Sequence, residues 1–145
     1  MEEFEEFYRR ERPRVFGSLL LIVRDRDVAM DATDEAFVRA LERWERVGTM
    51  EAPGGWLHTT ALNLARRQLR RRALERRLHL RVASTATVPD GMNTEVWEAL
   101  GALPHRQRVA VALRYLADLP EREIAAVMGI ARGTVSASLV AARRS

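Results

Sequence analysis

Almost every segment of this 145-residue chain repeats its apolar residues with the period of an α-helix. Residues 27–46 show the pattern most clearly, because acidic side chains take one face and an apolar stripe takes the other. We expect that stripe to hold Ala29, Ala32, Ala36, Phe37, Ala40, Leu41 and Trp44. No run of β-branched residues alternates with polar residues in the manner of a strand. The sequence therefore predicts an all-α fold.

Prolines, glycines and clusters of small polar residues divide the predicted helices into two groups. The first group comprises residues 3–23, which Pro13 should divide, residues 27–46, and a helix from Trp56 past Arg72 toward Arg81. A loop is expected between the last two of these, over residues 48–55. The second group comprises four shorter helices, at residues 94–102, 104–116, 120–128 and 132–143.

Turn-forming residues without an amphipathic period separate the two groups, and we assign residues 82–93 as a flexible linker. The chain is then predicted to form two small helical domains, residues 1–81 and residues 94–145. A linker of this length spans at most about 40 Å when fully extended.

The net charge of +4 conceals an uneven distribution along the chain. Residues 1–65 carry a net charge of −4, and residues 66–81 carry eight Arg and one Glu for a net charge of +7. The rest of the chain carries +1, and all 24 basic residues are arginine. One dense basic block between acidic and neutral segments is typical of a surface that contacts a polyanion such as nucleic acid.

Sequence patterns typical of catalysis, metal binding and secretion are missing. There is no cysteine, which excludes disulfides, thiolate zinc sites and cysteine nucleophiles. His58, His79 and His105 match neither metal-ligand nor triad spacing, and Gly54-Gly55 is too short for a phosphate-cradling loop. The N-terminus lacks the apolar run of a signal peptide, and no apolar stretch approaches the ~18 residues of a membrane span. We therefore expect a soluble cytoplasmic protein that is not an enzyme, with no metal, no cofactor and no membrane insertion.

Residues 123–144 have the spacing of a helix-turn-helix. Ala125 is small enough for a second helix to cross closely over it, and Gly129 can supply the positive φ of a tight turn. The second helix could enter a DNA major groove, although a small helical bundle without DNA contacts would share some of this spacing. The residues predicted to contact DNA are Arg132, Thr134, Ser136, Ser138, Arg143 and Arg144. Few of these side chains are long donors, so we expect groove recognition that is weak or that relies on DNA shape.

The helix that begins near Trp56 has one apolar and one polar face. Its leucines and alanines fall within an arc of about 160°. The opposite side carries Trp56, Thr59, Thr60, Asn63, Arg66, Arg67, Arg70 and Arg71. Guanidinium groups pair with phosphates, while an indole and an amide can stack on and hydrogen-bond an unpaired base. The face suits a melted DNA strand, although a solvated charged face, with the tryptophan capping the core, would give the same pattern.

Three segments resemble a known family, the extracytoplasmic-function (ECF) sigma factors of the sigma-70 family. Residues 31–44 (DATDEAFVRALERW) look like region 2.2, and residues 53–72 (PGGWLHTTALNLARRQLRRR) look like regions 2.3 and 2.4. Residues 103–144 are similar to region 4, including the Gly133-Thr134-Val135 start of its recognition helix. The motifs occur in the order and spacing of the family, and they cover nearly the whole chain except the linker.

The resemblance implies a bacterial transcription initiation factor that binds core RNA polymerase and promoter DNA. The region 2 helices would dock on the clamp coiled coil of the β′ subunit through Asp31, Asp34, Glu35, Arg39 and Glu42. The loop at residues 48–55 and the polar face of residues 56–71 would together capture the unpaired non-template strand of the minus-ten element. Region 4 would contact the minus-thirty-five element and the polymerase β flap, weakly because serines stand at positions 136 and 138 where the family often has Arg or Lys. An anti-sigma factor is a further partner that the resemblance implies.

Two other functions fit parts of the pattern. A stand-alone helix-turn-helix regulator would need a ligand pocket or phosphoacceptor within residues 1–80, and Asp25, Asp27 and Asp31 lie on predicted helices rather than at strand ends. A sigma mimic that binds only an anti-sigma protein should have lost the basic face, which is intact here. The sigma factor interpretation is therefore preferred.

Overall fold

The computed structural model describes residues 2–78 and 88–144, and every regular element in those residues is helical, which confirms the all-α prediction. The N-terminal half contains α1 (Phe4–Val23), α2 (Arg26–Glu42), α3 (Trp44–Val47) and α4 (Pro53–Arg77). The C-terminal half contains α5 (Thr94–Gly101), α6 (His105–Val111), the π-helical turn η1 (Ala112–Leu116), α7 (Glu121–Met128) and α8 (Arg132–Arg143). The predicted helix end near Arg81 and the first half of the predicted linker fall in residues 79–87, outside the described residues.

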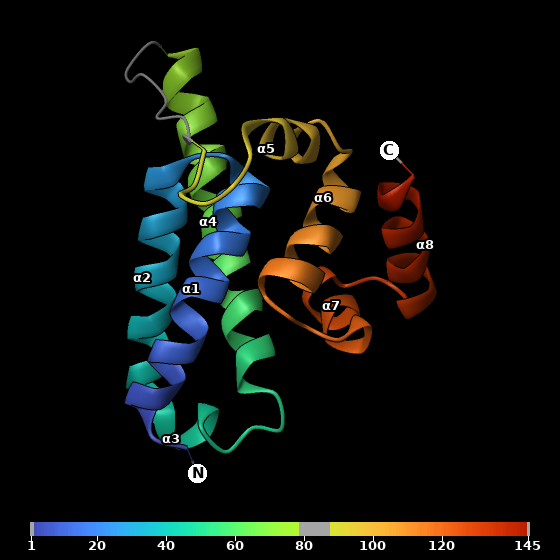
Figure 1. Ribbon diagram of the computed structural model, residues 1–145. Helices are drawn as coiled ribbons and strands as arrows, with labels where there is room; N and C mark the ends of the chain where they lie inside the picture. Colours follow the sequence, from blue (N-terminus) through green and yellow to red (C-terminus); the bar gives the residue numbers. More distant parts are fainter. Residues whose placement is uncertain (1, 79–87, 145) are drawn as a thin grey trace.

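α1 runs unbroken through Pro13, so the predicted division of this helix is wrong. Proline removes one backbone hydrogen bond and crowds the preceding turn. Packing offsets that cost, because Glu11 and Val15 on either side of the proline are both buried. α1 packs against α2, α4, α6 and η1, so it lies between elements of both halves of the chain (Figure 1).

α2 begins and ends differently from the prediction. The Asp25 carboxylate accepts a hydrogen bond from the Val28 backbone N–H at 3.1 Å and so caps the first turn. The helix ends before Arg43, so the predicted helix 27–46 is α2 followed by the single turn α3. Leu41, predicted on the buried stripe, is 57% exposed, because it lies about 120° around the helix from Ala29 and the alanines that meet the core.

α4 begins at Pro53 rather than at Trp56, so the predicted loop is limited to residues 48–52. Proline suits the first helical position because the N–H that it lacks would have no partner within the helix. Gly54 lies beside the buried Glu11 carboxylate, where a Cβ would come within 3.4 Å of Oε1. The start of α4 is thereby packed closely against α1.

α7 and α8 form the predicted helix-turn-helix and are bent by 104° at their junction. Gly129 has a φ of 68°, the left-handed conformation expected for the turn. Ile124 and Val135 are fully buried between the two helices, while the predicted helix 104–116 is α6 continued by η1. Among the described residues no single helix is long and apolar enough to cross a membrane, and α7 and α8 reach that length and composition only as a bent pair.

The two halves share one hydrophobic core. Phe7 and Leu21 of α1 belong to the same buried cluster as Val109, Leu113 and Ile124 of the C-terminal half. α1 packs against α5, α6 and η1, and α4 packs against α7 (Figure 1). The two halves are therefore packed against each other through this shared core.

Candidate nucleic-acid interface

α4 turns its apolar side into the core and its polar side outward. Leu57, Ala61 and Ala65 are fully buried. The eight residues predicted to contact DNA all lie along this one helix. Asn63, Arg67, Arg70 and Arg71 are exposed, and Trp56, Thr59, Thr60 and Arg66 are half-buried. The structure thus brings the predicted set together on a single helical face.

Trp56 belongs partly to the core and partly to the surface. Its side chain packs against the buried cluster while remaining half-exposed. The Thr60 hydroxyl donates a hydrogen bond to the Trp56 carbonyl oxygen at 2.8 Å, one turn along the helix. The indole is therefore anchored by the core and still partly accessible, which is the condition for stacking on a base without reordering the side chain.

One arginine of the basic run points inward. Arg72 is 4% exposed, and its Nη1 donates to Asp25 Oδ2 at 2.9 Å, with Asp27 at 3.7 Å. This ion pair fixes α4 against the start of α2. The helical angle could have identified it from the sequence, because Arg72 lies only about 60° from Leu57 and therefore within the apolar arc.

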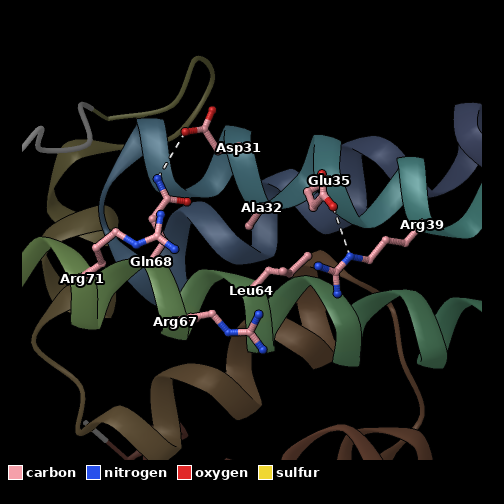
Figure 2. A pocket seen from close by; sticks show the side chains of 8 residues that line it. All are labelled: Asp31, Ala32, Glu35, Arg39, Leu64, Arg67, Gln68 and Arg71. Carbon is pink, nitrogen blue, oxygen red and sulfur yellow. Dashed lines mark hydrogen bonds and ion pairs between the residues drawn. The ribbon is translucent and has the colours of Figure 1, made fainter.

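A groove of about 320 Å³ runs between α2 and α4 (Figure 2). Asp31 and Gln68 join its two walls by a hydrogen bond of 3.2 Å from Nε2 to Oδ2. Arg39, on the α2 wall, donates to Glu35 at 3.1 Å. The lining residues are Asp31, Ala32, Glu35, Arg39, Leu64, Arg67, Gln68 and Arg71. Residues predicted separately for polymerase and for DNA contact therefore meet in one groove, which the sequence did not indicate.

The predicted polymerase surface lies on α2. Four of its members are exposed and Arg39 is half-buried; the exposed ones are Asp31, Asp34, Glu35 and Glu42. Beside them, Val38 and Leu41 are 48% and 57% exposed, and Tyr8 of α1 lies next to them along a second groove of about 270 Å³. Exposed apolar side chains surrounded by charge are typical of protein interfaces. Sequence reasoning missed this apolar patch because it assigned Leu41 to the core.

The predicted DNA residues of α8 are less available than those of α4. Arg132, Arg143 and Arg144 are exposed, and Thr134 is half-buried. The Ser136 hydroxyl donates to the Glu121 carboxylate, and Ser138 is only 8% exposed. Arg143 donates from Nε and Nη2 to the Tyr115 hydroxyl at 3.0 and 2.6 Å. α8 therefore presents few unengaged donors in this arrangement.

His58 is a packed helix residue, as predicted. It is 3% exposed, and its Nδ1 donates to the Gly54 carbonyl oxygen at 2.8 Å. Burial lowers the pKa of His58 below its ordinary value, so the ring is neutral near pH 7. No group of three or more His, Asp or Glu side chains in the described part of the chain is placed to hold a metal ion.

Comparisons with known proteins agree with this geometry. The Sigma-70 region 2 model matches residues 7–75, and the Sigma-70, region 4 model matches residues 93–145. The RNA polymerase sigma-E factor of Streptomyces avermitilis is 28% identical, over 94% of this chain and 79% of its own length. The ECF RNA polymerase sigma factor SigE of Mycolicibacterium smegmatis is 30% identical, over 93% of this chain and 56% of its own length. An uncharacterized protein of Rhizobium meliloti is 34% identical, but this chain spans only 31% of its length.

Among solved structures, the sigma factor RpoE in complex with the anti-sigma factor NepR from Bartonella quintana has the same fold. The TM-score is 0.79 at 22% identity, and the match covers 99% of this chain and 94% of that one. The two matched models follow each other in the same order as the two halves of the structure. The chain therefore belongs to the sigma-70 family of RNA polymerase sigma factors. Within that family, its relatives identify it as a sigma factor of the ECF type, as the sequence motifs predicted.

Proposed function

We propose that this sigma factor captures the unpaired non-template strand of the minus-ten element on the polar face of α4. The observation that carries the proposal is the exposure of Asn63, Arg67, Arg70 and Arg71 along one helix, beside the half-exposed Trp56. The arginines would neutralise successive phosphates, and the amide and indole would contact an extruded base. Extrusion costs a few kcal/mol of unstacking, which these contacts have to offset.

The same proposal assigns α2 to core RNA polymerase. Asp31, Asp34, Glu35, Arg39 and Glu42 would face the clamp coiled coil of the β′ subunit. The neighbouring Val38 and Leu41 add exposed apolar area, which usually contributes more to affinity than charged residues at the rim of an interface. An anti-sigma protein is a further partner proposed for this chain. Bond making in transcription would belong to the polymerase, so we propose a cytoplasmic, non-enzymatic role without cofactor.

α8 would contact the minus-thirty-five element and the β flap. Arg132, Arg143 and Arg144 are its exposed basic residues, and they suit phosphates better than base edges. We propose that residues 1–81 act as region 2, residues 82–93 as the linker, and residues 94–145 as region 4. The boundaries of the matched family models support this division.

The test is co-purification with core RNA polymerase, followed by transcription from a library of randomised promoters. We expect the wild-type chain to bind core polymerase and to select a minus-ten sequence. The Arg67→Ala/Arg70→Ala/Arg71→Ala variant should bind core polymerase but lose initiation. Arg76→Ala/Arg77→Ala is a control, because it removes exposed charge near the end of the same helix. Binding of duplex DNA without any binding of core polymerase would instead support a stand-alone regulator.

A further inference from the structure

One carboxylate lies in the interior of the N-terminal half, beside the first turn of α4. Glu11 of α1 is only 4% exposed, although glutamate is rarely buried unless it is paired. Its Oε1 lies 3.4 Å from the position that a Cβ of Gly54 would take. Since α1 and α4 pack against each other (Figure 1), α1 supplies this charge to the start of a neighbouring helix.

The two oxygens of the Glu11 carboxylate have different surroundings. Oε2 is paired with Arg10 Nε at 3.2 Å and with Arg14 Nη1 at 3.4 Å. Oε1 is buried and has no hydrogen-bond partner among the described residues. His58 of α4 does not balance the charge, because burial lowers the pKa of its ring and leaves the ring neutral near pH 7. One oxygen is therefore held by arginines, and the other faces the start of α4.

The start of α4 attracts a negative charge that its own first turn does not supply. A helix N-terminus carries a partial positive charge, because its first N–H groups have no partner within the helix. The N-cap residue of α4 is Ala52, which makes no side-chain cap, and the first turn holds no acidic residue. Glu51, just before the cap, is exposed, and Glu123 of α7, near Gly55, is half-buried. Water therefore screens both of these carboxylates more than it screens Glu11.

The first turn of α4 carries the aromatic residue of the proposed DNA surface. Trp56 lies two residues after Gly54, and its backbone N–H donates to the Ala52 carbonyl oxygen at 3.2 Å. His58 Nδ1 donates to the Gly54 carbonyl oxygen at 2.8 Å. The Thr60 hydroxyl donates to the Trp56 carbonyl oxygen at 2.8 Å, so side chains of the second turn hold the first. A displacement of the first turn would therefore move the indole with it.

We propose that Glu11 is a positioning residue for minus-ten recognition, because its buried carboxylate holds the first turn of α4 and thereby sets the position of Trp56 against an extruded base. The inference rests on the proposed function, in which Trp56 contacts that base. Glu11 itself would not touch DNA, since it is buried. Loss of its charge should weaken the discrimination of the base and leave the phosphate contacts of the exposed arginines unchanged.

The test removes the charge without changing the shape of the side chain. In Glu11→Gln an amide replaces the carboxylate, and Glu6→Gln, at an exposed position of α1, is the matched control. Ala52→Asp returns a carboxylate to the N-cap of α4, where aspartate is favoured. Comparing Ala52→Asp in the wild-type and Glu11→Gln backgrounds cancels any direct effect of the new charge on DNA.

The first readout is the binding of polymerase carrying each variant to fork-junction DNA with single abasic sites along the minus-ten element. At the most sensitive site, we expect loss of the base to weaken wild-type binding about tenfold, as expected for a base stacked on an aromatic side chain. In Glu11→Gln this penalty should fall to about threefold, with wild-type affinity for the abasic DNA itself. Glu6→Gln should match wild type, and Ala52→Asp in the Glu11→Gln background should restore most of the penalty.

The second readout follows Trp56 in the free protein, without DNA or polymerase. The chain has three tryptophans, so labelling with fluorotryptophan gives three fluorine NMR resonances, and Trp56→Phe assigns one of them. Glu11→Gln should shift or broaden the Trp56 resonance, while the resonance of Trp97, in the C-terminal half, should stay unchanged. Circular dichroism would verify that each variant keeps its helices.

Full base discrimination in Glu11→Gln, or an equal loss of binding to intact and abasic DNA, would overturn the inference. The same holds if Glu6→Gln behaves like Glu11→Gln, or if Ala52→Asp restores nothing. If no abasic site weakens wild-type binding, the proposed function fails and the recognition role of Glu11 fails with it. In that case an altered Trp56 resonance in Glu11→Gln would still uphold the positioning of α4 by this carboxylate.

Discussion

The polar faces of α4 and α8 differ in how many of their polar groups are already engaged. On α4, four of the predicted contact residues are exposed, and the inward-pointing Arg72 is paired with Asp25. On α8, Ser136 bonds to Glu121, Ser138 is buried and Arg143 bonds to Tyr115. Charge and hydroxyl groups contribute to binding only where a ligand can reach them. The N-terminal half should therefore dominate DNA affinity, although both halves carry arginines.

The largest expected effect concerns the ion pair that positions α4. Arg72→Ala leaves the Asp25 carboxylate buried without its partner, so the free energy of unfolding should fall by about 3–5 kcal/mol. In the C-terminal half, Glu121→Ala removes a half-buried bond to Ser136 and should cost about 1 kcal/mol. Urea denaturation measures both, with Arg71→Ala as the control next to Arg72. If Arg72→Ala and Glu121→Ala lowered the free energy of unfolding equally, burial of the Arg72–Asp25 pair would not explain its contribution.

The next effect compares the exposed arginines directly. Replacing Arg67, Arg70 and Arg71 by alanine should reduce the salt dependence of binding to promoter DNA with a melted minus-ten element, by about two in the slope of log K against log salt. Replacing Arg132, Arg143 and Arg144 should change the slope by only about two thirds as much, because Arg143 is held by Tyr115. Polymerase bound to each variant would be titrated on fork-junction DNA at several salt concentrations. A larger change for the α8 triple would reverse the ranking.

A third difference concerns pH. Burial lowers the pKa of His58 below its ordinary value of 6.5, so the unfolded chain binds the proton more tightly than the folded one. The stability that the neutral, buried His58 contributes is therefore fully present above pH 6.5, and it is lost progressively as the pH falls below that value. His58→Gln should flatten the dependence of Tm on pH between 7.5 and about 5, while His105→Gln, at an exposed position of the C-terminal half, should flatten it less. An unchanged pH profile in His58→Gln would assign the acid sensitivity to other groups.

The smallest expected effect adds a donor to α8. Ala137 is exposed on this helix, so Ala137→Arg should tighten binding to duplex DNA about threefold to fivefold at low salt. Ala126→Arg adds the same charge to an exposed position of α7 and serves as the matched control. Gel-shift titration with the free protein would measure both. Equal gains would indicate a non-specific charge effect and not a shortage of donors on α8.

Periodic patterns and turn residues predicted the helices and the helix-turn-helix. The polar face of α4 followed from helical geometry, and the positive φ of Gly129 followed from the freedom of glycine at the turn between two helices. Pro13 was misjudged because the burial of Glu11 and Val15 depends on helices far along the chain. The same reason explains why the pattern could not indicate that Ser136 meets Glu121 or that the two halves share a core. Local sequence specifies which side of a helix is apolar, but not which partner covers it.

Asp25 links the two helices that carry the proposed binding surfaces. One oxygen of its carboxylate caps the first turn of α2 at Val28, and the other binds Arg72 in the last quarter of α4. Fraying of the first turn of α2 therefore releases α4 at the same time, so the two segments should open as one cooperative unit. Amide hydrogens near Val28 and near Arg72 should then exchange with the same opening free energy. Substitutions on the two helices near this carboxylate will not combine additively, because they change one shared interaction.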